Sequence, residues 1–104
     1  MNIISKNIRN SARDEMCTLQ IAGVCNYDTS TTILAHFPDE TKGTGKKSDD
    51  ISAGFCCSSC HDVIDMRVRN EHFKENEDFY LRRAQTRTIK RLIELGIITI
   101  KGMK

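Results

Sequence analysis

The sequence predicts a small α+β domain with a helix at each end. Apolar residues recur every four positions near the N-terminus and again beyond residue 75, as they do on one face of a helix. Two short segments between them, 31–38 and 51–57, are rich in β-branched and apolar residues and indicate strands. No repeat or change of composition divides the 104 residues, so we expect a single domain, 1–104, whose modest core needs a cross-link.

The first predicted helix covers residues 3–15, where Ile4, Ile8 and Ala12 share one face. The segment CTLQIAGVC, residues 17–25, then alternates polar with apolar residues before an Ala-Gly turn. This pattern suits either a short hairpin or a metal-binding knuckle, and both of its ends are cysteines.

The predicted strands lie in the middle of the chain and near its end. TTILAHFP, residues 31–38, is ended by Pro38, and ISAGFCC, residues 51–57, is the second apolar segment. Between them, residues 39–50 are polar, charged and glycine-containing, which is typical of an exposed loop. IITI, residues 97–100, indicates a short closing strand.

Two further helices are predicted in the second half. Ser59 and Asp62 form a capping box, which predicts a helix that runs to about Arg67. A longer helix covers about 75–95, with acidic residues in its first turn and Gly96 as its stop.

The overall charge indicates no class of partner. Sixteen basic residues against fourteen acidic ones give a net charge of +2, so any surface for nucleic acid must be local. The N-terminus has no apolar stretch long enough for a signal sequence, and no window approaches the roughly 18 apolar residues of a membrane span. We therefore expect a cytoplasmic protein without a membrane partner.

Five cysteines allow several kinds of site. FCCSSCHDVID, residues 55–65, contains the C-x-x-C-H string of haem attachment, but haem of that type is joined outside the cytoplasm. A thioredoxin-like pair would need a neighbouring parallel strand and helix, and disulfides need an oxidising compartment. Metal binding agrees best with a reducing compartment, and five unrelated core thiols are the alternative.

A tetrahedral zinc site accounts for four of the cysteines. Cys57 and Cys60 have the spacing of one zinc knuckle, and Cys17 and Cys25, with seven residues between them, form the other pair. Cys56 is left as a small buried apolar residue. A structural zinc contributes about 10 to 16 kcal/mol, comparable to the whole stability of a domain, so we expect the fold to depend on it.

A second group of side chains suits a divalent ion. His61 lies in the first turn of a predicted helix, and Asp65 follows four residues later on the same face, so both can bind one ion. Imidazole and carboxylate suit Mg²⁺, Mn²⁺, Ni²⁺ or Zn²⁺. His36 stands near the end of the first strand. A surface histidine and a solvated aspartate are the alternative for this pair.

The order of these motifs resembles that of the HNH endonucleases, also called His-Me finger or ββα-metal nucleases, with a cysteine frame for zinc. The likeness is closer to the YbcO-type nucleases of lambda-like prophages, whose motifs stand here as CTLQIAGVCN, LAH, DDI and CSSCHDVID. It covers roughly residues 9–66 and weakens in the C-terminal helix. The resemblance implies a zinc-stapled ββα-metal core over about 16–68 and a flanking helix over about 75–95.

The resemblance also implies a role for each matching residue. His36 would be the general base that takes a proton from water, and Asp50, where the motif has its central asparagine, would orient that base. His61 and Asp65 would hold the catalytic ion, Mg²⁺ or Mn²⁺, that binds the scissile phosphate. Ala35 stands where many HNH enzymes have a further ligand, although the YbcO-type motif includes this alanine.

Basic residues gather on one side of the predicted C-terminal helix. On a helical wheel Arg83, Arg87, Lys90 and Arg91 lie within an arc of about 100°. The neighbouring arc is largely apolar and comprises Tyr80, Leu81, Ala84, Thr88, Leu92 and Leu95. One face can therefore pack while the next meets phosphates, with a solvated basic face as the alternative. Further candidates for phosphate contacts are Arg67, Arg69, Lys46 and Lys47.

We therefore predict a metal-dependent endonuclease that hydrolyses phosphodiester bonds in duplex or branched DNA, with a structural zinc and a catalytic divalent ion. The alternative is a non-catalytic zinc module that binds DNA or a phage protein, which Ala35 favours. Further candidate partners are a second copy of the chain and phage recombination or replication proteins.

Overall fold

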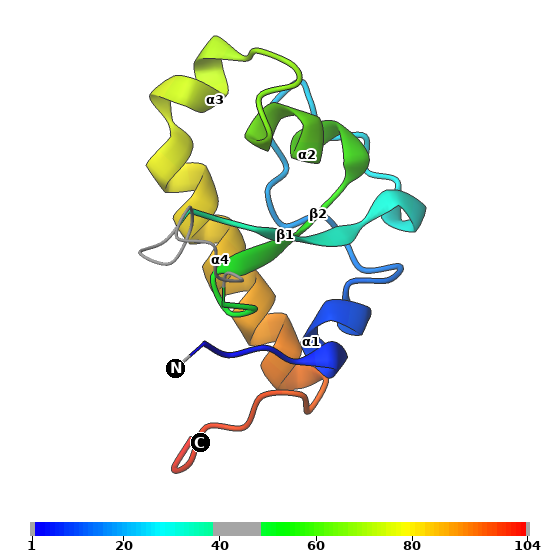
Figure 1. Ribbon diagram of the computed structural model, residues 1–104, viewed down its shortest axis with the longest axis vertical. Coiled ribbons are helices and arrows are strands. Elements are labelled where there is room, and N and C mark those ends of the chain that lie inside the picture. Colours follow the sequence, from blue (N-terminus) through cyan, green and yellow to red (C-terminus); the bar gives the residue numbers. More distant parts are fainter. Residues whose placement is uncertain (1, 39–48, 104) are drawn as a thin grey trace.

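The structure of the chain is a computed structural model that describes residues 2–38 and 49–103 (Figure 1). Its elements are, in order, α1 (Lys6–Ser11), the 3₁₀ turn η1 (Thr29–Thr31), β1 (Ile33–His36), β2 (Ala53–Cys56), α2 (Ser58–Ile64), α3 (Glu71–Glu75) and α4 (Glu77–Glu94). The predicted α+β class is confirmed. Most of the predicted loop 39–50, with Lys46 and Lys47, lies outside the described residues. None of the helices in the described part of the chain has the length and apolarity of a membrane span.

β1 and β2 pair antiparallel and form a two-stranded ribbon, called the β1–β2 ribbon below. Leu34 lies opposite Phe55, so both side chains point to the same face. Because side chains alternate along a strand, His36 shares that face with Leu34, and Ala35 points to the other.

The two faces of the ribbon bury two separate hydrophobic clusters. The first cluster, on the Ala35 face, joins both cysteine-bearing segments to α2, α3 and α4; its buried members are Cys17, Leu19, Ile21, Ala35, Phe37, Cys56, Cys57, Cys60, Val63, Phe73, Tyr80 and Ala84. The second cluster, on the Leu34 face, packs α1 against the end of α4, with buried members Ile8, Ala12, Phe55 and Leu92. In Figure 1, α2 lies above the ribbon and α1 below it.

Two threonines close the second edge of β2. The Phe55 carbonyl accepts a hydrogen bond from the Thr18 N–H at 2.8 Å, and the Phe55 N–H donates to the Thr88 hydroxyl at 3.0 Å. The two hydroxyls lie 3.0 Å apart and form a hydrogen bond with each other. Thr88 therefore fixes α4 across β2, and the Phe55 backbone is not open to another strand.

The first helix is shorter than the predicted range 3–15. α1 begins after Ser5, whose hydroxyl accepts from the Ile8 N–H at 3.2 Å, and it ends at Ser11. Ile4 precedes this cap and is 51% exposed, so only Ile8 and Ala12 of the predicted face are buried. The serine cap fixes the start because its side chain satisfies a free N–H of the first turn.

The start predicted for the second helix, at Ser59, was also wrong. The cap of α2 is Cys57, whose thiol accepts from the Cys60 N–H at 3.4 Å, and Ser59 already lies inside the helix. α2 ends at Ile64, before the predicted end, and Met66 has a positive φ of 63° that the helix cannot continue through.

The predicted helix 75–95 is confirmed as α4, although the shorter α3 precedes it as a separate helix. Asn70 caps α3, where its side-chain oxygen accepts from the Phe73 N–H at 2.8 Å. The buried residues of α4 recur every four positions, which carries the helix across both clusters; they are Tyr80, Ala84, Thr88 and Leu92. Leu95, predicted on the packed arc, is 41% exposed.

Gly96 ends α4 as predicted, and it has a positive φ of 76°. The Gly96 N–H donates to the Ile93 carbonyl at 3.0 Å and the Ile97 N–H to the Leu92 carbonyl at 2.9 Å, which is the Schellman arrangement. The predicted strand 97–100 was wrong, because this turn folds the chain back and packs Ile97 against the second cluster.

Candidate functional site

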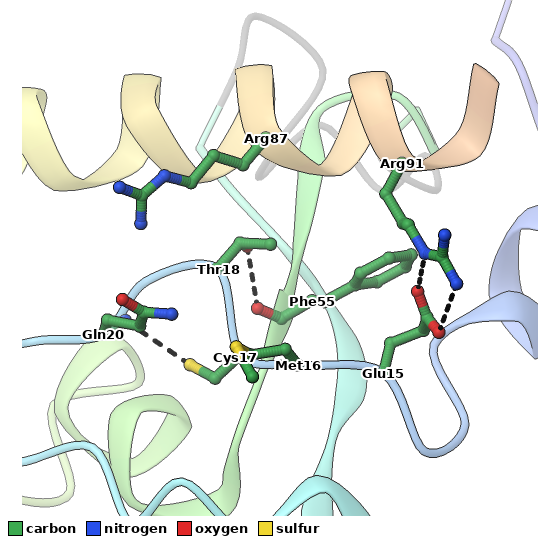
Figure 2. A pocket seen from close by; sticks show the side chains of 8 residues that line it. All are labelled: Glu15, Met16, Cys17, Thr18, Gln20, Phe55, Arg87 and Arg91. Carbon is green, nitrogen blue, oxygen red and sulfur yellow. Dashed lines mark hydrogen bonds and ion pairs between the residues drawn. The ribbon is translucent and has the colours of Figure 1, made fainter. Parts of the chain in front are cut away.

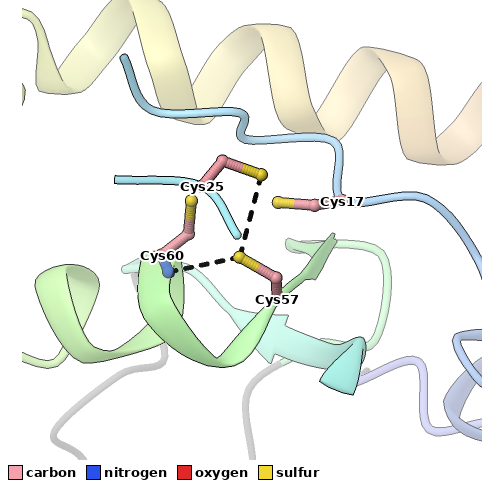
Figure 3. A group of neighbouring side chains, drawn as sticks. All are labelled: Cys17, Cys25, Cys57 and Cys60. Carbon is pink, nitrogen blue, oxygen red and sulfur yellow. Dashed lines mark hydrogen bonds between the residues drawn. The ribbon is translucent and has the colours of Figure 1, made fainter. Parts of the chain in front are cut away.

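Four cysteines from two distant parts of the chain converge (Figure 3). Cys17 and Cys25 are the ends of residues 17–25, called the knuckle below, and Cys57 and Cys60 lie at the start of α2. Their Sγ atoms all lie within 4.8 Å of one another, and Cys56 is not part of the group. The spacing argument selected the same four residues.

The arrangement of the thiols fits a tetrahedral zinc ion. Four Zn–S bonds of about 2.3 Å place neighbouring sulfur atoms about 3.8 Å apart. The Sγ atoms of Cys25 and Cys57 are 3.8 Å apart, far beyond the roughly 2 Å of a disulfide, and all five cysteines are free. Four sulfur ligands leave no open position, which suits a structural ion.

The knuckle brings its ends together without a hairpin. Leu19 and Ile21 are almost wholly buried in the first cluster, and the Ile21 carbonyl accepts from the N–H groups of Val24 and Cys25, each at 3.0 Å. The knuckle, which lies entirely within the described residues, contains no strand. Burial of these two apolar side chains therefore explains how Cys17 and Cys25 can bind one ion although seven residues separate them.

Burial and neighbouring thiols shift the pKa values of three of the four cysteines. Hydrogen bonds with Cys56 and Cys60 lower the pKa of the Cys17 thiol, whereas burial raises the pKa of Cys25 to about 12. The hydrogen bond with Cys17 and, second, burial raise the pKa of Cys60. A divalent cation would therefore have to displace the protons of thiols such as Cys25 and Cys60.

His36 and Asp50 form the first of two histidine–carboxylate pairs. Nε2 of His36 lies 2.8 Å from Oδ1 of Asp50, and the Asp50 side chain is fully buried while that of His36 is 32% exposed. The carboxylate also accepts from the Ser5 N–H at 2.6 Å and from Nε of Arg9, at 3.2 Å and 3.1 Å to its two oxygens. One buried carboxylate thus joins β1 to α1 and to the N-terminal segment.

These contacts keep Asp50 ionised. Burial raises its pKa, but hydrogen bonds from His36, Ser5 and Arg9 together outweigh burial, so the pKa lies below its usual range. An ionised carboxylate only accepts hydrogen bonds, so Nε2 of His36 must be the donor. When the imidazole is neutral, its other nitrogen, Nδ1, therefore carries the lone pair.

His61 and Asp65 form the second pair, at α2 and its C-cap. Nε2 of His61 lies 3.1 Å from Oδ2 of Asp65. The same oxygen lies 3.1 Å from a guanidinium nitrogen of Arg67, which also pairs with Asp62 at 2.8 Å. Among residues 2–38 and 49–103, no third His, Cys, Asp or Glu joins this pair in a donor group.

The two pairs are attached to opposite faces of the β1–β2 ribbon. His36 points to the α1 face, whereas α2 packs on the first cluster at the other face. Ala35, the position at which the resemblance to HNH enzymes would put a further ligand, is 2% exposed and belongs to the first cluster. The structure therefore brings the four residues together as two pairs and not as one group.

Comparison with known proteins agrees with this combination of motifs and fold. The sequence profile of the family described as "Putative nuclease YbcO" matches residues 6–97. The chain belongs to this family. Two relatives of that name, from Escherichia coli strain K12 and from Enterobacteria phage 82, are each 44% identical to it over 63 residues. That segment is 60% of this chain and 66% of each relative.

A solved structure also shares the fold of this YbcO family member. It is described as a putative bacteriophage protein from Escherichia coli K-12 substrain MG1655. It superposes with a TM-score of 0.64 at 30% sequence identity, and the match covers 86% of this chain and 100% of the other. The family and both named relatives are described as putative nucleases.

The six basic residues predicted to meet nucleic acid differ in their contacts. Carboxylates neutralise three of them: Arg67 pairs with Asp62 and Asp65, Arg69 with Glu71, and Arg91 with Glu15 and Glu94. Arg83 donates to the Leu19 carbonyl at 2.7 Å. Arg87 and Lys90 form no hydrogen bond or ion pair with a described residue. Figure 2 shows Arg91 bound to Glu15, while Arg87, one turn earlier on α4, forms no hydrogen bond or ion pair with the other residues drawn.

Sequence reasoning missed two residues beside these sites. Arg9 anchors Asp50, and nothing in the pattern of α1 distinguishes it from the other charged residues of that segment. Arg82 lies on the exposed face of α4. A helical wheel that included Phe79, three residues before Arg82, would have found it.

Removal of one zinc ligand is expected to unfold the domain. Cys57→Ala leaves three thiols, and a structural zinc contributes on the order of 10 to 16 kcal/mol, so this variant should lose its zinc and its cooperative unfolding. Metal analysis per chain and far-UV circular dichroism measure both.

Because zinc binding displaces the protons of thiols such as Cys25 and Cys60, zinc affinity should also fall as the pH falls.

Cys56→Ala is the matched control, since Cys56 is equally buried but lies outside the group. It should keep one zinc per chain. The reverse result, with zinc retained by Cys57→Ala and lost by Cys56→Ala, would show that Cys56 is the zinc ligand in place of Cys57.

Proposed function

We propose that this chain is a metal-dependent DNA endonuclease of the HNH type, in which His36 activates the water that attacks a phosphodiester bond. The observation that carries the proposal is the hydrogen bond between His36 and the buried, ionised carboxylate of Asp50. The family's description as a nuclease and the order of the motifs support it.

Asp50 prepares His36 for the role of a base. Its carboxylate holds the imidazole by Nε2–H, while Arg9 and Ser5 hold the carboxylate from the other side. The ring therefore has a fixed orientation and a fixed tautomer. Nδ1 is left to accept a proton, and the His36 side chain as a whole is partly exposed.

Water is the proposed source of that proton. As the proton moves to Nδ1, the hydroxide formed attacks phosphorus in line with the bond to O3′, and the negative charge of Asp50 offsets the positive charge gained by His36. The P–O3′ bond breaks, O3′ takes a proton from solvent, and the ends are a 5′-phosphate and a 3′-hydroxyl. A base in this position contributes about 10² to 10⁴ in rate.

His61 and Asp65 are the proposed ligands of the catalytic divalent ion. When bound, such an ion neutralises phosphate charge and stabilises the departing oxygen. The two donor atoms fit only part of its coordination sphere, and Arg67 competes for the carboxylate. We therefore expect weak binding by the chain alone, with water and phosphate oxygens as the other ligands.

A non-catalytic zinc module that binds DNA or a phage protein is the second candidate. The observation that favours it is the position of the two pairs on opposite faces of the ribbon, with Ala35 buried where a further ligand could stand. Such a module would keep the four-cysteine site and α4 but would not use His36 as a base.

Replacement of the proposed base should abolish cleavage. His36→Ala is expected to lose about 10²- to 10⁴-fold in the rate of cleavage of supercoiled, linear or branched DNA with Mg²⁺ or Mn²⁺, at unchanged zinc content. His72→Gln, which removes another of the three histidines, is the control and should keep the wild-type rate. Equal activity of wild type and His36→Ala would refute the assignment, and no cleavage by wild type would favour the non-catalytic module.

Asp50→Asn tests the orientation of the base. The amide oxygen would stay with Arg9 and Ser5, which turns the NH₂ group toward His36 and favours the tautomer that carries its proton on Nδ1. The cleavage rate should fall nearly as far as in His36→Ala, with zinc content unchanged. Asp49→Asn makes the same charge change one residue away and should cleave normally; a comparable loss there would show a general effect of charge.

Mn²⁺ binding tests the second pair. In zinc-loaded protein with inorganic phosphate present, the wild type should reduce the sharp electron paramagnetic resonance signal of free Mn²⁺, and Asp65→Asn should not. Arg67→Met should strengthen Mn²⁺ binding, because it removes the cation that competes for the carboxylate. Unchanged binding in Asp65→Asn would place the ion elsewhere.

A further inference from the structure

Positive charge without a neutralising partner is concentrated on one face of α4. Of the other arginines that the structure describes, those at 9, 67, 69 and 91 each contact a carboxylate, whereas Arg13 stands alone at the end of α1. On α4, Arg82, Arg87 and Lys90 form no ion pair with a described residue, and Arg83 is held by a backbone carbonyl, so its charge is not cancelled. Four cations therefore lie close together on this face with no carboxylate paired to them among the described residues.

The same face is hollowed and carries an exposed aromatic ring. A shallow groove of about 670 Å³ is lined by Asp78, Phe79, Arg82, Arg83, Thr86, Arg87 and Lys90. Phe79 is 59% exposed, although a ring of this size is usually buried. The Arg83 guanidinium lies 5.1 Å from the ring centroid, and Tyr80 meets the ring edge-on at 5.8 Å, so the ring is held in place.

Charge and an aromatic platform together indicate the chemistry of the ligand. From Phe79 to Lys90 the groove follows α4 for about 16 Å, and basic side chains recur at each turn, which suits a phosphate backbone laid along the helix. An exposed ring offers a surface for a base to stack on, and the faces of bases are free in a single strand but covered in a duplex. Binding through phosphate contacts alone would not require the exposed ring of Phe79.

We propose that this face of α4 binds single-stranded nucleic acid, with one base stacked on Phe79 and phosphates against Arg82, Arg87 and Lys90. The inference rests on the proposed nuclease function in one respect: it names the single-stranded part of a branched or partly unwound substrate as what the enzyme holds. Asp78, at the Phe79 end of the groove, repels phosphate and marks the end of the path.

Binding is measured with His36→Ala protein, so that no substrate is cleaved. Fluorescence anisotropy compares oligo-dT, oligo-rU and a DNA duplex of equal length over a range of salt concentrations. The expected result is tighter binding of either single strand than of the duplex. A difference between oligo-dT and oligo-rU would identify DNA or RNA as the natural strand.

Substitutions at Phe79 separate stacking from charge. Phe79→Ala and Phe79→Leu should weaken single-strand binding roughly 5- to 100-fold without changing its salt dependence, whereas Phe79→Trp should retain it. The double variant Arg82→Gln, Arg87→Gln should reduce the slope of log affinity against log salt by about 1.4, the value for two single-strand phosphates. Arg13→Gln, an exposed arginine at the end of α1, is the control for charge and should bind as wild type.

Two results would overturn the inference: equal affinity for duplex and single strand, or single-strand binding unaffected by Phe79→Leu. Absence of all nucleic-acid binding would overturn it as well and would favour an acidic protein as the partner of this face. The outcome is separable from that of the proposed function. Phe79-dependent binding without any cleavage by wild type would uphold the inference and reject the enzyme, and His36-dependent cleavage with Phe79-independent binding would do the opposite.

Discussion

The convergence of four thiols on one position is the interaction on which the rest of the structure depends. The knuckle contains no strand, and α2 has seven residues, so neither is stable as an isolated element. A zinc ion held by both would fasten the knuckle to the start of α2 and, through the preceding β2, to the ribbon. The Tyr80 hydroxyl accepts from the Ala22 N–H at 3.2 Å and adds α4 to the same assembly. The first cluster thus forms around the four thiols.

On the other face of the ribbon, a single carboxylate holds several segments of the chain together. Asp50 joins α1 through Arg9, β1 through His36 and the N-terminal segment through Ser5, and it is fully buried. Breaking one side of such a buried pair leaves a charge without compensation, which is costly. The group that would orient a catalytic base is therefore also a structural tie, and the two roles impose the same geometry on it.

α4 illustrates how pairing, rather than the number of charges, distinguishes one basic surface from another. One stripe of the helix is buried and includes Thr88, which closes the edge of β2. On the exposed side, Arg91 is neutralised by Glu15, whereas Arg87 one turn away is not. A net charge of +2 thus conceals a face with several cations that no described carboxylate neutralises, while Arg9 and Arg67 are paired within the fold.

The sequence by itself determined the features that depend on spacing within a few residues. These include the C-x-x-C pair, the two strands, the buried stripe of α4 and its end at Gly96. Only the tertiary structure decided which charges meet across long separations: Arg9 with Asp50, 41 residues away, and Glu15 with Arg91, 76 residues away. It also decided that a thiol caps α2 and that His36 and His61 belong to different faces of the ribbon. Helical and strand periods report which side of an element is buried, but which partner lies there is set by how the whole chain packs.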